Sequence, residues 1–78
     1  MNNTIKQPKE MTVREIRDNF TKEDIESIFK LNGLYIRTCD DKGDSRYGMT
    51  RCFSPTDRLW TFHSHVLAYH YFLEMNWI

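Results

Sequence analysis

Residues 59–78 read LWTFHSHVLAYHYFLEMNWI and carry one formally charged side chain, Glu74. Written on a helical wheel, the apolar residues of this stretch fall on every side, and a helix that is apolar on all sides must be covered on all sides. We expect a helix that begins near Ser64 and runs almost to Ile78. The rest of the chain has to supply its cover, so this helix decides the fold.

Two short helices are predicted before it. Capping-box patterns, in which Thr is followed three residues later by an acidic side chain, begin at Thr12 and again at Thr21. They predict helices over residues 13–19 and 22–31, and the second ends at Gly33, a residue suited to the left-handed conformation. A single bent helix through both ranges is the alternative.

A β-hairpin is predicted between these helices and the last one. Residues 34–39 are rich in β-branched and aromatic side chains, which favour a strand. Residues 40–45 carry Asp, Gly and Ser, which favour a turn, and residues 46–53 are expected to return as the antiparallel partner. A third short strand at residues 58–62 is left open.

The expected fold class is α+β, a small single domain in the order ααββ(β)α. An antiparallel hairpin or three-stranded sheet is packed by the C-terminal helix. The domain is expected at residues 12–78, behind a flexible N-terminal arm at residues 1–11 that is polar and contains Pro8. Hydrophobic residues make up 40 % of the 78 residues and aromatic residues 14 %, too many for a chain that stays unfolded.

The charges of the chain cancel, because eleven Lys or Arg stand against eleven Asp or Glu. DNA-binding domains normally carry a clear excess of basic side chains, which neutralise a run of phosphates. Any nucleic-acid site is therefore expected to be a local patch. Apolar runs are short, so we expect neither a signal peptide nor a membrane span.

The two cysteines, Cys39 and Cys52, are too few for the disulfide framework of a small secreted domain. We expect reduced thiols and a cytoplasmic location. The three histidines, His63, His65 and His70, do not have the spacing of zinc ligands. Since no motif of nucleophilic catalysis or phosphate binding is present, we expect a protein that is not an enzyme and that has no cofactor and no metal.

The C-terminal helix offers more apolar surface than the sheet can cover. Either Phe20, Ile25, Ile28 and Phe29 cover the remainder, or the remainder is an interface, since large apolar patches are uncommon on monomers. Both interpretations stay open at this point. The contact residues expected for an interface are Tyr69, Phe72, Met75, Trp77, Arg51 and Arg58.

We interpret the chain as a non-enzymatic protein-binding module. A small intracellular regulator or inhibitor that docks on a larger protein, of the kind that viruses and mobile elements encode, fits this pattern by analogy. The partner is either a larger protein or a second copy of the chain. The alternative is a single-stranded RNA or DNA binder that uses aromatic and basic side chains of the hairpin. Its candidate residues are Tyr35, Arg37, Tyr47 and Arg51.

Overall fold

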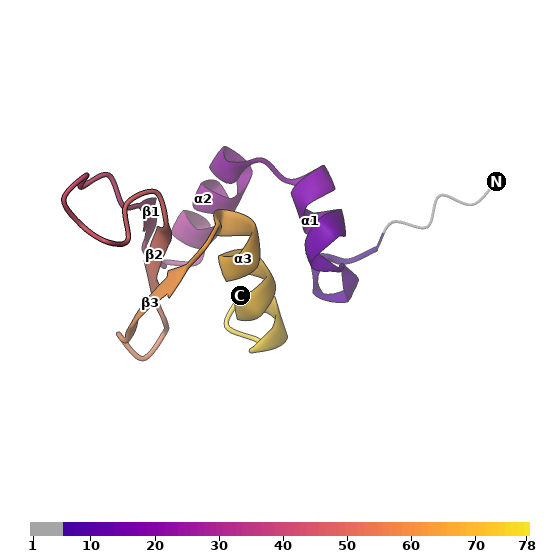
Figure 1. Ribbon diagram of the computed structural model, residues 1–78. Coiled ribbons are helices and arrows are strands. Elements are labelled where there is room, and N and C mark those ends of the chain that lie inside the picture. Colours follow the sequence, from indigo (N-terminus) through magenta and orange to yellow (C-terminus); the bar gives the residue numbers. More distant parts are fainter. Residues whose placement is uncertain (1–5) are drawn as a thin grey trace.

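The computed structural model describes residues 6–78. Figure 1 shows three α-helices and a three-stranded sheet, which confirm the α+β class and the order α, α, β, β, β, α. The third strand, left open by the sequence, is present and pairs with the second. The elements are a 3-10 helix η1 (Pro8–Glu10), α1 (Val13–Asn19), α2 (Lys22–Leu31), β1 (Ile36–Thr38), β2 (Thr50–Phe53), β3 (Leu59–Phe62) and α3 (His65–Glu74).

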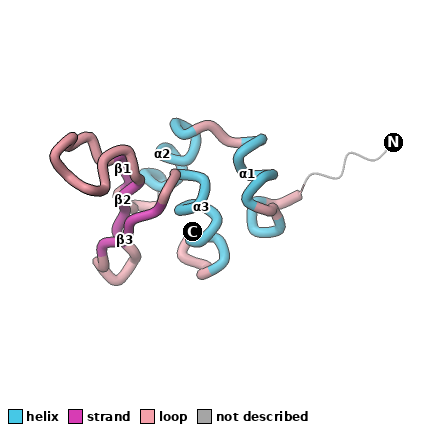
Figure 2. The backbone as a smooth tube through the Cα atoms, in the orientation of Figure 1, coloured by secondary structure: helices cyan, strands magenta, loops and turns pink. Residues whose placement is uncertain are grey.

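The sheet is antiparallel with the strand order β1–β2–β3, so β2 is central and β3 is an edge strand. Ile36 lies opposite Cys52, and Cys52 lies opposite Trp60. Side chains alternate across a sheet, and the buried side chains of Thr50 and Cys52 show which face is covered. The helices lie on that side of the sheet (Figure 2). Arg51 alternates with Thr50 and Cys52 and points to the opposite face, which carries no helix of residues 6–78 and which we call the open face.

The loop between β1 and β2 is longer than the sequence predicts. The returning strand was expected at residues 46–53, but β2 begins at Thr50. The cause is a turn in which Asp44 Oδ1 accepts the Arg46 N–H at 2.8 Å. The Arg46 side chain also binds this carboxylate and lowers the pKa of Asp44 to about 2. Gly48 follows with a φ of 84°, a conformation that glycine adopts without strain.

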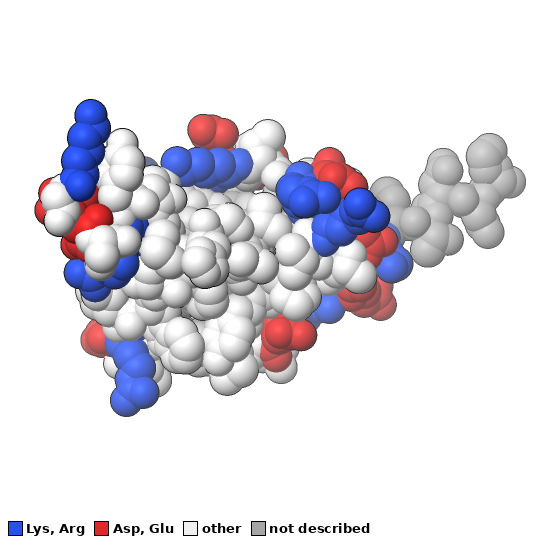
Figure 3. Space-filling view, viewed as in Figure 1, with Lys and Arg blue, Asp and Glu red and all other residues white. Residues whose placement is uncertain are grey.

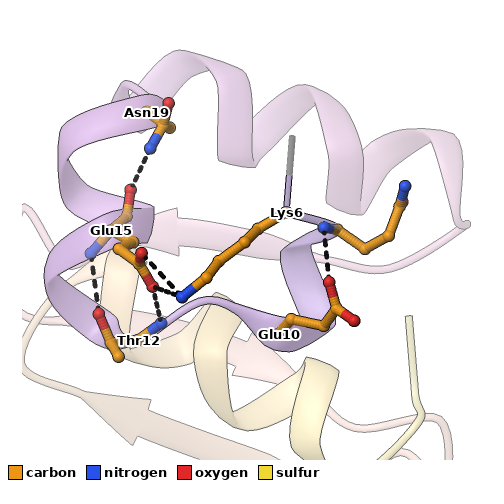
Figure 4. Close-up of polar contacts among 6 residues, drawn as sticks. Lys6, Glu10, Thr12, Glu15 and Asn19 are labelled. Atoms are coloured by element: carbon orange, nitrogen blue, oxygen red, sulfur yellow. Dashed lines mark hydrogen bonds and ion pairs between the residues drawn. The ribbon is translucent and has the colours of Figure 1, made fainter. Parts of the chain in front are cut away.

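Both predicted capping boxes are confirmed. Thr12 Oγ1 accepts the Glu15 N–H at 3.2 Å, and Glu15 Oε1 accepts the Thr12 N–H at 2.9 Å. Figure 4 shows Lys6 reaching the same carboxylate, with 3.0 Å between Nζ and Oε2. The Thr12 N–H and then the Lys6 side chain lower the pKa of Glu15. Thr21 and Asp24 repeat the box at the start of α2, so the chain forms two helices and not one bent helix.

The last helix, α3, lies at the centre of the hydrophobic core. It contacts α1, α2, β2 and β3. The ring of Tyr69 lies 5.3 Å from that of Phe20, and the ring of Phe29 lies 4.8 Å from that of Phe72. Ile25 is fully buried beside them. Residues of α2 and of the segment before it therefore cover one side of α3, while another side faces β3.

The helix α3 ends earlier than the sequence predicts. It stops at Glu74 because Asn76 adopts a φ of 58°. Behind it, the Trp77 N–H donates to the Phe72 carbonyl at 2.9 Å, and the two rings lie 5.0 Å apart. This is a Schellman motif with its hydrophobic contact. Gly33, with a φ of 71°, ends α2 in the same way, as predicted.

The N-terminal arm, expected to be flexible, is packed on the domain over the part that the structure describes. Residues 1–5 lie outside the described residues. The short helix η1 contacts α3, and Met11 packs against the core. Lys9 Nζ donates a hydrogen bond of 2.6 Å to Asn76 Oδ1. The apolar side chain of Met11 explains the difference, because it gives this end of the chain a contact in the core.

Replacement of Asn76 tests how the helix end is held. Asn76→Ala and Asn76→Gly both remove the hydrogen bond from Lys9, so the difference between them isolates the backbone conformation. A residue with a Cβ that adopts the left-handed conformation destabilises the folded state by about 1 kcal/mol relative to glycine. We expect Asn76→Ala to be less stable than Asn76→Gly by about that amount in chemical denaturation followed by circular dichroism. Equal stabilities would show that residue 76 does not hold this conformation in solution.

Candidate functional site

A buried chain of hydrogen bonds links the sheet to two helices. Thr50 Oγ1 lies 2.7 Å from His65 Nδ1, and His65 Nε2 lies 2.9 Å from Glu26 Oε2. A carboxylate only accepts hydrogen bonds, so His65 Nε2 donates to Glu26, and His65 Nδ1 shares the second hydrogen bond with the Thr50 hydroxyl. Thr50 and His65 are both buried. The chain thus fixes the start of α3 against β2 and α2.

A cavity of about 250 Å³ adjoins this chain of hydrogen bonds. The order carboxylate, imidazole, hydroxyl is the one that activates nucleophiles in enzymes. Thr50, however, is only 2 % exposed, and its hydroxyl is already bound to His65. The geometry therefore supports a role in positioning α3. The cavity is lined by Lys22, Thr38, Gly48, Thr50, His63, Ser64, His65 and Val66.

Sequence reasoning missed this chain. No motif includes Glu26, and His65 is one of three histidines that lack the spacing of zinc ligands. Glu26 and His65 are 39 residues apart, and Thr50 lies between them in another element. No local pattern marks a contact of this kind, which depends on how α2 and α3 are packed.

An uncharged face lies over α3 and β3. Figure 3, in the orientation of Figure 1, shows it at the centre, with Lys, Arg, Asp and Glu towards the margins. Its aromatic side chains contact one another: the Tyr71 ring lies 5.3 Å from Trp60, 5.6 Å from Phe62 and 5.7 Å from Trp77. All four side chains are partly exposed. We call these four residues the aromatic face.

The aromatic face contains one of the predicted contact residues, Trp77. Tyr69 and Phe72 are a correction, because they are 3 % and 0 % exposed and belong to the core. They point towards α2, on the side of α3 that the rest of the chain covers. Met75 is exposed at the end of α3, and Arg58 is exposed just before β3.

Three residues of the aromatic face, Trp60, Phe62 and Tyr71, were not predicted. The alternation of Trp60 and Phe62 along β3 was an available signal, since residues two apart lie on the same face of a strand. Tyr71 gave no such signal, because α3 is apolar on all sides and only its packing shows which side is left uncovered.

The residues proposed for nucleic acid lie mostly on the open face of the sheet. Arg37 lies opposite Arg51, and the exposed rings of Tyr35 and Phe53 are 5.5 Å apart beside them. Arg37 pairs with Asp40 at 3.2 Å, which offsets one of the two charges. Arg51 Nε is buried without a hydrogen-bond partner among residues 6–78.

Tyr47, the fourth nucleic-acid candidate, lies in the loop between β1 and β2, where it is 52 % exposed. It is outside the strands that carry the other three candidates. The structure therefore brings Tyr35, Arg37 and Arg51 together and leaves Tyr47 apart from them on the loop.

The two cysteines are free and buried. The Cys39 N–H donates to the Met49 carbonyl at 2.8 Å, whereas Cys52 lies opposite Ile36, so the thiols stand at different positions of the sheet. Burial raises the pKa of the Cys52 thiol to about 11. In residues 6–78, no three His, Cys, Asp or Glu side chains are grouped so that they could hold a metal ion.

None of the helices in the described part of the chain has the length and apolar character needed to cross a membrane. Comparisons with models of protein families, with curated proteins and with solved structures find no match for this chain. Two surfaces of the chain are candidates for binding, the aromatic face and the open face of the sheet.

Substitution of Thr50 tests the buried chain of hydrogen bonds. Thr50→Val keeps the shape of the side chain but leaves His65 Nδ1 buried without its hydrogen-bond partner, a loss that costs about 1–3 kcal/mol. Thr50→Ser keeps the hydroxyl and serves as the control. We expect the free energy of unfolding to fall by that amount for Thr50→Val and by clearly less for Thr50→Ser. A Val variant as stable as the Ser variant would mean that the hydrogen bond contributes nothing.

Proposed function

We propose that the chain is a non-enzymatic protein-binding module that docks through its aromatic face. One observation carries the proposal: four large aromatic side chains of β3 and α3 contact one another at the surface of an uncharged face and remain partly exposed. Aromatic side chains are enriched at the centres of protein interfaces, and charged side chains are depleted there. Charges at the margin correspond to the polar rim of such an interface.

The size of the domain supports a role as a regulator or inhibitor of a larger protein. A standard interface buries about 800 Å² on each partner, and the accessible surface of this chain is 5596 Å². Docking through one face would thus use about one seventh of the surface of this chain and would cover a comparable area of the partner. We propose that this interaction takes place in the cytoplasm, and the two free, buried thiols support this location.

One substitution within the aromatic face, one beside it and one matched control test this proposal. Tyr71→Glu and Met75→Glu place a charge at the centre and at the margin of the docking surface. Leu31→Glu is the control, because Leu31 is 86 % exposed on α2. We expect the wild type and Leu31→Glu to capture the same amount of partner protein. The captured amount should fall at least about tenfold with Tyr71→Glu, since a buried unpaired charge is costly in an interface.

The measurement is quantitative mass spectrometry of proteins retained by each tagged variant, with circular dichroism to confirm that each variant is folded. Met75→Glu should give an intermediate loss of captured protein, because Met75 is exposed and a charge at this position can stay in contact with water. Retention of the same proteins by all four chains would show that the aromatic face is not the docking surface.

A second candidate function is the binding of single-stranded RNA or DNA on the open face of the sheet. The observation that favours it is the placement of Tyr35 and Phe53 beside Arg37 and Arg51 on adjacent strands. Exposed rings on a sheet stack bases, and guanidinium groups meet phosphates. The ion pair of Arg37 with Asp40 weakens this candidate and makes protein binding the first proposal.

The second candidate is tested with a fluorescent single-stranded oligonucleotide. The double variant Arg37→Ala and Arg51→Ala should weaken binding by about tenfold or more, and binding should fall steeply with salt. The control is Arg17→Ala with Arg58→Ala, which removes two charges from exposed positions outside the strands. Equal affinity of the two double variants, or binding that does not depend on salt, would exclude the open face as the site.

A further inference from the structure

The free edge of β3 borders the aromatic face. β3 is an edge strand, and its four residues include neither a charge nor a proline. Edge strands are normally protected by such residues, because their unpaired N–H and C=O groups can pair with another strand. The view in Figure 1 looks onto this edge, with α3 beside it, and the same region is uncharged in Figure 3.

The hydrogen-bond pattern shows which groups of β3 point outwards. The Ser54 N–H donates to the Arg58 carbonyl, so these two residues form a hydrogen-bonded pair. Hydrogen-bonded and non-hydrogen-bonded pairs alternate along an antiparallel ladder. Trp60 and Phe62 therefore direct their main-chain groups to β2, and Thr61 directs its N–H and C=O to the free edge.

The same alternation follows from the other side of β2. The Phe53 N–H donates to the Tyr35 carbonyl, and the Cys39 N–H donates to the Met49 carbonyl. Phe53 and Met49 are thus turned to β1, and Cys52, between them, is turned to β3. Since Cys52 is opposite Trp60, both sides of the sheet assign the outward groups of β3 to the same residues.

Thr61 can pair with Thr61 of a second copy across a twofold axis. In that register the two threonines exchange both main-chain hydrogen bonds, and Trp60 stands directly opposite Phe62 of the second copy. This aromatic pair is a non-hydrogen-bonded pair, in which side chains approach most closely. It lies on the helix side of the sheet, where each copy presents Tyr71 and Trp77. The register therefore joins the strand edges and the aromatic faces together.

The charge distribution favours a second copy at this edge and not at the edge of β1. In the β3 register, Arg58 stands opposite Ser64 of the second copy, so no like charges face one another. The edge of β1 carries Arg37 and borders a hollow lined by Glu26 and Lys30. Ionised side chains around an edge oppose strand pairing.

We propose that the free edge of β3 and the aromatic face bind a second copy of this chain, which forms a twofold dimer with a continuous six-stranded sheet. A standard interface of about 800 Å² per partner would take about one seventh of the accessible 5596 Å² of each copy. This inference rests on the proposed function, because it names the occupant of the same face. Self-association and docking on a larger protein then exclude each other, which makes the dimer a resting form.

N-methylation of one amide tests the register directly, and a chain of 78 residues is short enough for chemical synthesis. N-methyl-Thr61 removes the outward N–H and blocks the edge without changing a side chain. N-methyl-Thr38 is the matched control, because Thr38 is a threonine of β1 whose N–H points outwards by the same alternation. The readout is the mass in sedimentation equilibrium over a series of concentrations, compared with twice the 9.5 kDa of one chain.

We expect the wild type and N-methyl-Thr38 to dimerise and N-methyl-Thr61 to dissociate at least about tenfold more readily, because two intermolecular hydrogen bonds are lost. Should N-methyl-Thr61 fail to fold, Thr61→Lys gives a second test, since two like charges then meet at the axis. A monomeric wild type, or a dimer unaffected by both changes at Thr61, would overturn the inference.

These outcomes are separable from those of the proposed function. A wild type that is monomeric but still captures proteins lost with Tyr71→Glu would overturn the dimer and leave the docking proposal standing. If the wild type forms a dimer that the changes at Thr61 weaken, but captures no more protein than the Tyr71→Glu variant does, the docking proposal is overturned and the dimer stands. Increased capture by N-methyl-Thr61, which frees the face, is the result expected if dimerisation and docking compete.

Discussion

The apolar surface of α3 is the constraint around which most of this chain is arranged, since η1, α1, α2, β2 and β3 all pack against this helix. Its Tyr69 and Phe72 require aromatic partners, which Phe20 and Phe29 supply from the region of α2. Another side of it faces the edge strand β3, which is four residues long. A sheet of three strands that is covered on one face by helices has few side chains left for this task. The partly covered aromatic face is thus a consequence of the size of the fold.

The sequence predicts those features that are encoded locally. The capping boxes at Thr12 and Thr21 and the glycine at position 33 fix helix ends by hydrogen bonds within a few residues, and the structure has them where expected. Asn76 was missed because asparagine adopts the left-handed conformation less often than glycine, and no neighbouring residue marks it. The exposed side of α3 was not predictable, since a helix apolar all round has no periodicity that distinguishes a core side from a surface side.

The buried hydrogen bonds of His65 and the aromatic face are parts of the same arrangement. His65 stands at the first residue of α3, and its two bonds fix the rotation of the helix about its axis. Tyr71 follows six residues later, less than two turns along the same helix. Hydrogen bonds depend on direction, so those of His65 help to fix the rotation of α3 that brings Tyr71 against Trp60. Apolar packing alone specifies such a rotation less strictly.

Both tryptophans of the chain, Trp60 and Trp77, lie in the aromatic face with their rings 6.1 Å apart. Their indole rings cross at 63°, and the Trp60 Nε1 is shielded from solvent. Tryptophan absorption and fluorescence of the protein thus come entirely from the surface that we assign to association, because both tryptophans of the sequence lie there. A molecule that binds this surface changes the solvent exposure of both indole rings. Tryptophan fluorescence therefore reports directly whether the aromatic face is occupied.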